Sequence, residues 1–253
     1  MALHGWIILD KPVGIGSTQC VSAVKRALRE AGEPKTKVGH GGTLDPLASG
    51  VLPIAIGEAT KLAGRMLDAT KDYEFTIRFG EETDTLDAEG ELVAASDERP
   101  TLADIEAVLP RFTGAISQVP PAFSALKIDG KPAYARARAG ETVEMAPRQV
   151  TVHSLTVRPE LVEGLPFSLS GHEDRASTGS VRTIDEVTFA ATVSKGTYIR
   201  SLARDIARAL GTVGHVTMLR RTRAGPFGLE KAISLDFLGK AAKARSLDGA
   251  VLP

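Results

Sequence analysis

The chain carries strand-like patterns at several separated places. Residues 5–9 form a short apolar run that predicts a buried strand. Residues 73–79 alternate apolar and polar side chains, as expected for a strand with one buried face. Residues 150–157 and 187–193 predict two further strands, which would form a hairpin were it not for the segment between them.

Three segments have helical spacing instead. The first begins at a cap, Ser17 or Thr18, and runs to about residue 31. The second covers residues 101–109, and the third follows Thr197, where apolar and basic positions each recur every four residues. Because strands and helices are interspersed without regular βαβ alternation, the sequence predicts an α+β fold with a mixed, largely antiparallel central sheet flanked by helices.

The composition is that of an ordinary globular protein, with 43% hydrophobic and 25% charged residues over 253 positions. The longest apolar runs are too short to cross a bilayer, so we expect no membrane association. The N-terminal residues lack the basic and apolar regions of a secretory signal. The single cysteine, Cys20, excludes an internal disulfide and fits a reducing compartment, so we expect a cytoplasmic protein.

The net charge is zero, yet the charges are unevenly distributed. Residues 81–98 contain eight acidic residues and no lysine or arginine, whereas residues 195–223 contain seven basic residues against Asp205 alone. A neutral total can therefore conceal a positive face of the kind that attracts phosphate groups. A solvated helix face is the alternative interpretation of the basic segment.

The stretch GHGGTLDPLASG, at residues 39–50, places Asp45 before a proline in a glycine-rich turn. Glycine allows backbone conformations with positive φ, and Pro46 biases Asp45 toward an extended conformation. An acid held by such a backbone, with apolar neighbours, suits presentation to a ligand. An ordinary Asx-type turn before a short strand explains the same pattern.

Five further segments accompany this turn in a fixed order along residues 9–221. The six together closely resemble the TruB-type tRNA pseudouridine synthases. In chain order they read LDKPVGIGS (9–17), GHGGTLDPLASG (39–50), KDYEFTIRFG with the following TDT (71–85), QVPPAFSALKIDGKPAYARAR (118–138), SKGTYIRSLARDI (194–206) and HVTMLRR (215–221).

The resemblance implies a pseudouridine synthase catalytic fold and a reaction, the isomerisation of a T-loop uridine of tRNA, position 55, to pseudouridine. The N-glycosidic bond breaks, the base turns in the pocket, and it reattaches through carbon. Nothing is oxidised and no water is consumed, so we expect neither a cofactor nor a metal. The scattered histidines and the absence of a GxxxxGK[ST] phosphate loop agree with this expectation. The expected partner is tRNA, bound through its T-arm by a monomer.

By the same resemblance, Asp45 is the catalytic aspartate. A carboxylate there can act as a nucleophile or can assist proton removal from the ribose through a glycal-like intermediate, and the sequence does not choose between these routes. Arg200 matches the arginine that pairs with this aspartate, a task that suits a permanently charged, bidentate guanidinium. Without the resemblance, Arg200 reads as a surface residue of a basic helix stripe.

The remaining site residues are also assigned by resemblance. Tyr73 matches the tyrosine that stacks on the target base and takes part in catalysis, while Tyr198 and Leu219 match positions that line the same pocket. His40 matches the histidine that fills the space left by the displaced nucleotide. Core packing is the plain alternative for the two tyrosines and the leucine. We also expect basic residues of 195–223 and of 127–138 to contact the RNA backbone.

For the domains, we expect a catalytic domain at residues 1–225, with an insertion at 159–182 that has no chemical role. Residues 226–253 hold one expected helix, at 235–244, and are too few for the PUA-type RNA-binding domain that members of this family commonly carry.

Two other functions stay open from the sequence. One is a tRNA-binding folding chaperone in which the chemistry is secondary. The other is a small-ligand domain that uses the glycine-rich turn for phosphate, which the lack of a strand, glycine loop and helix around that turn disfavours.

Overall fold

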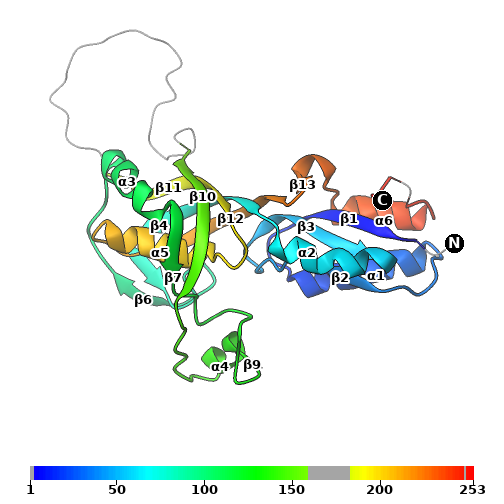
Figure 1. The fold of residues 1–253 in the computed structure, drawn as a ribbon, viewed down its shortest axis with the longest axis horizontal. Coiled ribbons are helices and arrows are strands. Elements are labelled where there is room, and N and C mark those ends of the chain that lie inside the picture. The colour runs from blue at the N-terminus through cyan, green and yellow to red at the C-terminus, as the bar shows by residue number, and fades with distance from the viewer. Residues whose placement is uncertain (1–2, 159–182, 248) are drawn as a thin grey trace, which may run out of the picture. The chain divides into compact units, whose positions relative to one another are not determined.

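The computed structural model describes residues 3–158, 183–247 and 249–253 (Figure 1). The chain divides into two compact units. Unit 1 comprises residues 1–74 and 219–253, and unit 2 comprises residues 75–218. The expected insertion at 159–182 lies outside the described residues, so its prediction is not addressed by the structure.

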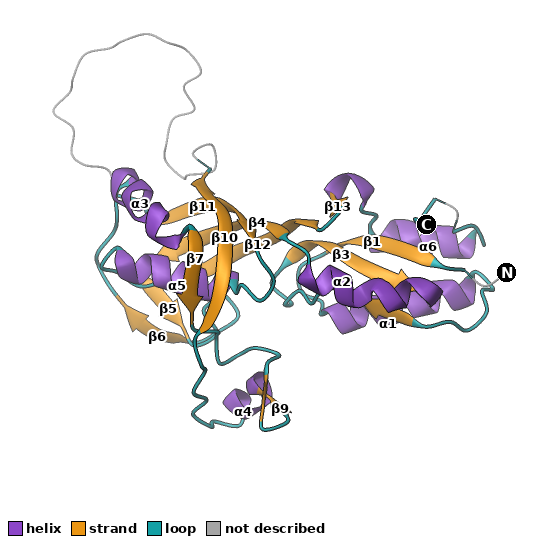
Figure 2. Ribbon diagram, in the orientation of Figure 1, coloured by secondary structure: helices purple, strands orange, loops and turns teal. Residues whose placement is uncertain are grey.

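Unit 1 combines helices with strands (Figure 2). Its elements in chain order are β1 (Gly5–Lys11), α1 (Ser17–Glu30), β2 (Val38–His40), β3 (Ser49–Ile56), a 3₁₀ helix (Gly57–Leu62), α2 (Ala63–Asp68), the first part of β4 (Lys71–Phe79), the last part of β12 (Gly214–Ala224), β13 (Phe227–Gly228), a 3₁₀ helix (Leu229–Lys231) and α6 (Leu235–Lys243). The expected helix at 235–244 is therefore present.

The sheet of unit 1 is built around β3. This strand pairs with β1 and β2 in antiparallel fashion and with β12 in parallel, at Arg220 to Ser49 and Arg221 to Gly50. Trp6 and Ile8 of β1 join one apolar cluster that includes Met66 of α2. The helices α1 and α6 contact each other, α1 contacts β3 and α6 contacts β1. Because both faces of β1 are covered, its residues 6–9 form a continuous apolar run rather than an alternating one.

Unit 2 contains the longer strands and the helix that follows Thr197. Its elements in chain order are the last part of β4, β5 (Glu81–Thr83), β6 (Leu92–Ala95), α3 (Leu102–Val108), a 3₁₀ helix (Leu109–Phe112), β7 (Gly114–Gln118), β8 (Lys127–Ile128), β9 (Lys131–Pro132), α4 (Ala133–Arg138), β10 (Arg148–Val157), β11 (Glu186–Val193), α5 (Ile199–Ala209) and the first part of β12.

In unit 2 the strands follow the order β12, β4, β11, β10, β7. β10 pairs with β11 in antiparallel fashion, so the expected strand pair is confirmed although twenty-four residues between the strands are undescribed. Phe75 of β4 stacks on Phe189 of β11, with ring centroids 5.3 Å apart. The apolar side of α5, which includes Leu202 and Ile206, is fully buried. The prediction of an α+β fold with a mixed, largely antiparallel sheet is confirmed.

Candidate active site

Asp45 lies in the connection between β2 and β3 of unit 1 and is half-buried. The backbone N–H of Ala48 donates to the carbonyl of Asp45 at 3.1 Å, which closes a β-turn with Pro46 at its second position. The carbonyl of Pro46 accepts in turn from the N–H of Gly14 at 2.9 Å. The turn that carries Asp45 is thus closed by one main-chain bond of its own and joined by another to Gly14, in the loop that precedes α1.

Ser17 holds the same turn from α1. Its hydroxyl accepts from the N–H of Leu44 at 2.8 Å and donates to the carbonyl of Leu44 at 2.9 Å. The prediction that Ser17 or Thr18 caps α1 is wrong, since Gly16 is the N-cap and its N–H donates to the side chain of Gln19. The physical reason is that the Ser17 hydroxyl is used by the turn instead of by its own helix.

Lys11 is a third support of the turn and is fully buried. Its ammonium donates to the carbonyl oxygens of Pro12 and Ile15 at 2.9 and 2.6 Å, and to that of Pro46 at 3.3 Å. Removing a charged group from water is costly unless hydrogen bonds replace its hydration. Lys11 obtains these bonds from the loop before α1 and from the residue next to Asp45.

His40 is the last residue of β2, paired with Ile54 of β3, and so lies in a strand rather than in the glycine-rich turn. Its Nδ1 atom is buried and has no hydrogen-bond partner among the described residues. Burial, followed by the nearby charge of Arg221, lowers the pKa of the His40 imidazole below its ordinary value. His40 is therefore a neutral ring at neutral pH.

Tyr73 and Leu219 also belong to unit 1. Tyr73 lies on β4 and is half-buried, while the apolar side chains that follow it on the same face, Phe75 and Ile77, are fully buried. Leu219 is a buried residue of β12. Unit 1 thus carries four of the six expected site residues.

Arg200 is the second residue of α5 in unit 2 and is 6% exposed. Its guanidinium lies 3.2 Å from the carboxylate of Asp87 and donates to the carbonyl oxygens of Thr85 and Phe123 at 2.8 and 2.9 Å. The interpretation of Arg200 as a solvated residue of a basic stripe is therefore wrong. Its acceptors come from two loops distant in sequence, which only the folded unit brings together.

Asp87 is a residue that the sequence reasoning missed. It is 2% exposed, and its Oδ1 atom accepts from the hydroxyl of Thr85 at 2.6 Å and from the N–H of Glu89 at 3.1 Å. These bonds hold the carboxylate while it faces Arg200. The acidic run at 81–98 opposite a basic run was the available signal, but it does not identify which acid pairs with which base.

Tyr198 is the N-cap residue of α5, and its backbone is hydrogen-bonded to the side chain of Gln118 at the end of β7. The Gln118 side chain accepts from the N–H of Tyr198 at 2.8 Å and donates to its carbonyl at 3.1 Å. Gln118 is 2% exposed, and both the oxygen and the nitrogen of its buried side-chain amide are hydrogen-bonded to the backbone of Tyr198. These two hydrogen bonds fix the start of α5, two residues before Arg200.

The expected positive face of residues 195–223 is reduced by pairing. Arg208 forms an ion pair with Glu82 at 2.9 Å, and Arg223 binds Asp72 through two bonds of 2.6 and 2.8 Å. Arg221 is 1% exposed and cannot contact an RNA backbone at the surface, which corrects the expectation for that residue. Acidic side chains accept hydrogen bonds from Arg208 and Arg223, and main-chain carbonyls accept those of the buried Arg221, so part of the positive charge of this segment is offset within the protein.

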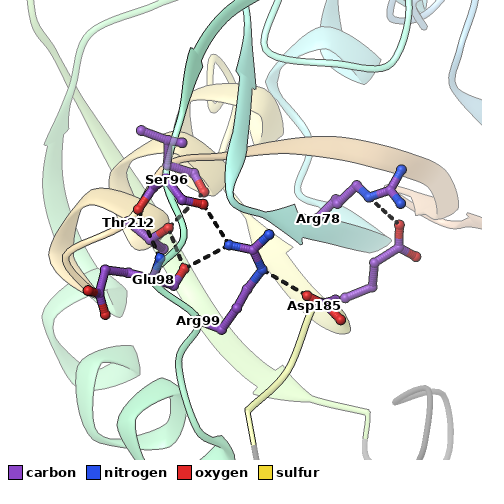
Figure 3. A network of polar contacts seen from close by, with 8 residues as sticks. Arg78, Ser96, Glu98, Arg99, Asp185 and Thr212 are labelled. Atoms are coloured by element: carbon purple, nitrogen blue, oxygen red, sulfur yellow. Dashed lines mark hydrogen bonds and ion pairs between the residues drawn. The ribbon is translucent and has the colours of Figure 1, made fainter.

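A second polar cluster in unit 2 centres on Arg99 (Figure 3). Its guanidinium binds Asp185 at 2.8 Å and the carbonyls of Ser96 and Glu98 at 2.7 and 3.1 Å, and Thr212 donates to the same Glu98 carbonyl. The cluster borders a cleft of about 450 Å³. These bonds tie residues 96–99 to Asp185 and Thr212, which are distant from them in the sequence.

Within the described residues, no group of three or more histidine, cysteine, aspartate or glutamate side chains is arranged to hold a metal ion. None of the helices in those residues has the length and apolar character needed to span a membrane.

Comparison with known proteins gives a consistent result. The chain matches the family described as TruB family pseudouridylate synthase (N terminal domain) over residues 25–199, and tRNA pseudouridylate synthase B C-terminal domain over residues 200–253. The tRNA pseudouridine synthase B of Novosphingobium aromaticivorans is 60% identical, over 99% of this chain and 77% of that relative. The protein of the same name from Zymomonas mobilis is 58% identical, over 100% of this chain and 76% of that relative.

A solved structure is also similar to this chain. A chain in the crystal structure of a Cbf5-Nop10-Gar1 complex matches with a TM-score of 0.66 and 29% identity. The match covers 98% of this chain and 60% of that one, so this chain spans less than two thirds of the length of that structure.

Proposed function

This chain belongs to the TruB family of pseudouridylate synthases and is a tRNA pseudouridine synthase, and we propose that it modifies the T-loop uridine at position 55 through Asp45. In this isomerisation the bond between N1 of uracil and C1′ of ribose breaks and a bond between C5 and C1′ forms. The proton on C5 is lost and N1 gains one. The reaction is balanced without an oxidant, a metal or a consumed water.

One observation supports the role of Asp45. Its turn is fixed by two buried side chains, Ser17 of α1 and Lys11 of β1, while the Asp45 side chain itself is half-buried. A rigid backbone around a partly accessible carboxylate is what a reaction at a carbon centre requires, because placement within a fraction of an ångström decides the rate. Attack on C1′ and proton removal from the ribose are both compatible with this placement.

Arg200 is proposed as the cation that pairs with Asp45. The two residues belong to different units, so this pairing rests on the family resemblance. In unit 2, Asp87 and two carbonyl oxygens hold the guanidinium. Asp87 is thereby proposed as the residue that orients Arg200.

The remaining residues handle the base. A base in a folded loop must be flipped out, at a cost of a few kcal/mol. Stacking on an aromatic ring returns about 1–3 kcal/mol, which is the role proposed for Tyr73. His40 is proposed to fill the vacated place in the T-loop, and its neutral ring suits insertion among stacked bases. Tyr198 and Leu219 are proposed to line the pocket.

The partner is tRNA, and we propose that it is bound through the T-arm by a monomer in the cytoplasm. Lys127, Lys131 and Arg138 of unit 2 are exposed and remain candidates for phosphate contacts. Such contacts would make the affinity for tRNA fall steeply with salt concentration.

The test is the substitution Asp45→Asn. We expect pseudouridine formation on unmodified tRNA to be abolished, while the fold and the affinity for tRNA stay as in the wild type. The measurements are tritium release from tRNA that carries 5-tritiated uridine, a pseudouridine-specific map of the tRNA, and circular dichroism. Glu58→Gln, at an exposed acid of unit 1, is the matched control and should keep full activity.

Activity in Asp45→Asn would refute the catalytic assignment, and modification of an anticodon-arm uridine would refute the substrate. The chaperone alternative is tested with the same variant. If refolding of tRNA is accelerated equally by Asp45→Asn and the wild type, RNA handling is separable from the chemistry.

A further inference from the structure

Arg221 is a buried cation whose observed partners carry no formal charge. It is 1% exposed, and its guanidinium donates to three main-chain carbonyls and forms no ion pair with a carboxylate among the described residues. The Nε atom donates to Val51 at 2.7 Å, Nη2 donates to Gly42 at 3.1 Å, and Nη1 donates to Thr43 at 3.3 Å.

This arrangement is unusual in energetic terms. Burying a guanidinium costs several kcal/mol even after relaxation, and an opposite charge normally offsets much of that cost. Three carbonyl dipoles replace only part of the lost hydration. A leucine or methionine would fill the same space without this cost, so the arginine is expected to serve a purpose beyond packing.

The position of the carbonyls suggests that purpose. Gly42 and Thr43 lie three and two residues before Asp45, within the connection that leads from β2 into the turn. The third carbonyl, that of Val51, belongs to β3, the strand that follows the turn. The planar fork of Arg221 therefore ties the segment before Asp45 to the strand after it.

The backbone of Arg221 is fixed as closely as its guanidinium group. Arg221 is opposite Gly50 in the parallel pairing of β12 with β3. Gly50 has φ of +98°, and a Cβ atom at this position would lie 2.1 Å from the carbonyl oxygen of Arg221. The glycine thus lets the two backbones approach, and the guanidinium extends from a defined point.

We propose that Arg221 is a positioning residue for catalysis: it orders the Gly42–Thr43 backbone and so sets the placement of the Asp45 carboxylate. This inference rests on the proposed function of Asp45. Arg221 is buried and binds carbonyls on either side of the turn, whereas the basic residues expected to bind tRNA are exposed. Arg221, Gly42, Thr43, Val51 and Asp45 all belong to unit 1.

His40 supplies an independent reporter. The charge of Arg221 contributes, after burial, to the lowered pKa of the His40 imidazole. An uncharged residue at position 221 removes that contribution, whereas lysine retains a positive charge. The His40 titration therefore tells whether the side chain at position 221 still lies beside the turn.

The experiment compares Arg221→Met and Arg221→Lys with the wild type in the full chain. For Arg221→Met we expect single-turnover tritium release to fall about 100-fold, the loss that a misplacement of about 1 Å can cause, with tRNA affinity little changed. For Arg221→Lys we expect about a tenfold fall, because one ammonium cannot reproduce the planar fork. The His40 signal, followed by NMR, should titrate at higher pH in the methionine variant and near its wild-type position in the lysine variant.

Arg220→Met is the matched control on the same strand. Arg220 binds the carboxylate of Asp10 on β1 at 2.8 Å, so its loss should leave the His40 titration in place. If Arg221→Met folds, binds tRNA and reacts at the wild-type rate, the inference is refuted. If that variant does not fold, Arg221→Lys decides, and a wild-type rate there also refutes the need for the fork.

Asp45→Asn, measured in parallel, separates the two levels of the argument. Activity in that variant refutes the proposed role of Asp45 whatever happens at position 221. An inactive Asp45→Asn together with a fully active Arg221→Met refutes only the role of Arg221.

Discussion

The turn that carries Asp45 and the start of α5, which carries Arg200, are held by opposite means. In unit 1, the buried cations Lys11 and Arg221 bind main-chain carbonyls of the turn and its flanks. In unit 2, the cation is the candidate functional group itself, and the carboxylate of Asp87 helps to hold it. In one region positive charge supports an acid, and in the other an acid supports positive charge.

The difference predicts different consequences of mutation. A scaffold made of bonds to carbonyls fixes the path of the backbone, so its loss should change geometry more than charge balance. A scaffold made of a buried ion pair fixes a side chain and balances its charge, so the removal of one partner takes away a counter-charge inside a low-dielectric interior. Substitutions in the scaffold of unit 2 should therefore cause the largest losses of unfolding free energy. Substitutions in the scaffold of unit 1 should cause the largest losses of reaction rate.

The largest effect on stability is expected from Asp87→Ala. The substitution leaves the guanidinium of Arg200, which is 6% exposed, without its observed carboxylate partner. Breaking a buried pair from one side costs about 3–5 kcal/mol in unfolding free energy. Urea unfolding of the full chain measures this, and pseudouridine formation should be lost as well. Asp87→Asn, which keeps an oxygen acceptor, should be less severe.

The matched control is Glu186→Ala. Glu186 pairs with Arg78 at 3.6 Å, with half of the arginine side chain exposed, and a pair of this kind contributes about 0–1 kcal/mol. Equal losses for Asp87→Ala and Glu186→Ala would contradict the distinction between the two scaffolds.

A smaller loss of stability is expected from Ser17→Ala. The hydroxyl of Ser17 satisfies both backbone groups of Leu44, a residue that is 4% exposed. Leaving a buried N–H and carbonyl unpaired costs about 1–3 kcal/mol. Because Leu44 immediately precedes Asp45, the single-turnover rate should also fall, while tRNA binding should not.

Ser22→Ala tests the same helix without touching the turn. The hydroxyl of Ser22 is exposed and donates to the carbonyl of Thr18 within α1. We expect a change within about 0.5 kcal/mol and a normal rate. A slow Ser22→Ala enzyme would show that α1 itself, rather than the bond to Leu44, limits the reaction.

The sequence predicted the elements well because hydrophobic spacing is a local property. The expected strand at 73–79 lies within β4, and the expected pair at 150–157 and 187–193 is the antiparallel pair of β10 and β11. The cap of α1 was misassigned because a serine at a helix start has two uses. Only the tertiary contact with Leu44 shows which use applies.

The candidate site was predictable in part. Asp45 and Arg200 were assigned roles through the family motifs, whereas Asp87 lies outside those motifs. Lys11 and Arg221 lie within two of the motifs, but no role was assigned to them, because their contacts with carbonyls such as those of Pro46 and Gly42 appear only in the folded chain. A charge count over 195–223 indicated a positive face, but it could not tell a buried arginine such as Arg221 from an exposed one such as Arg208.

The smallest expected effect concerns pH and the cation in unit 1. The His40 imidazole has a pKa lowered by burial and then by Arg221, so the folded chain resists protonation at this site. The unfolded chain takes up a proton there as the pH falls through about 6.5 and therefore binds more protons than the folded chain just below that value. Stability is thus full above about pH 6.5 and declines as the pH falls toward the lower, folded-state pKa.

His40→Gln removes this titration. The difference in unfolding free energy between wild type and variant should be constant above about pH 6.5 and shift in favour of the variant below it, as measured by urea unfolding over a pH series. Parallel curves at all pH values would contradict the assignment. Main-chain carbonyls hold the guanidinium of Arg221, yet its positive charge still lowers the pKa of the neighbouring His40 imidazole. The scaffold of the turn would then act electrostatically as well as geometrically.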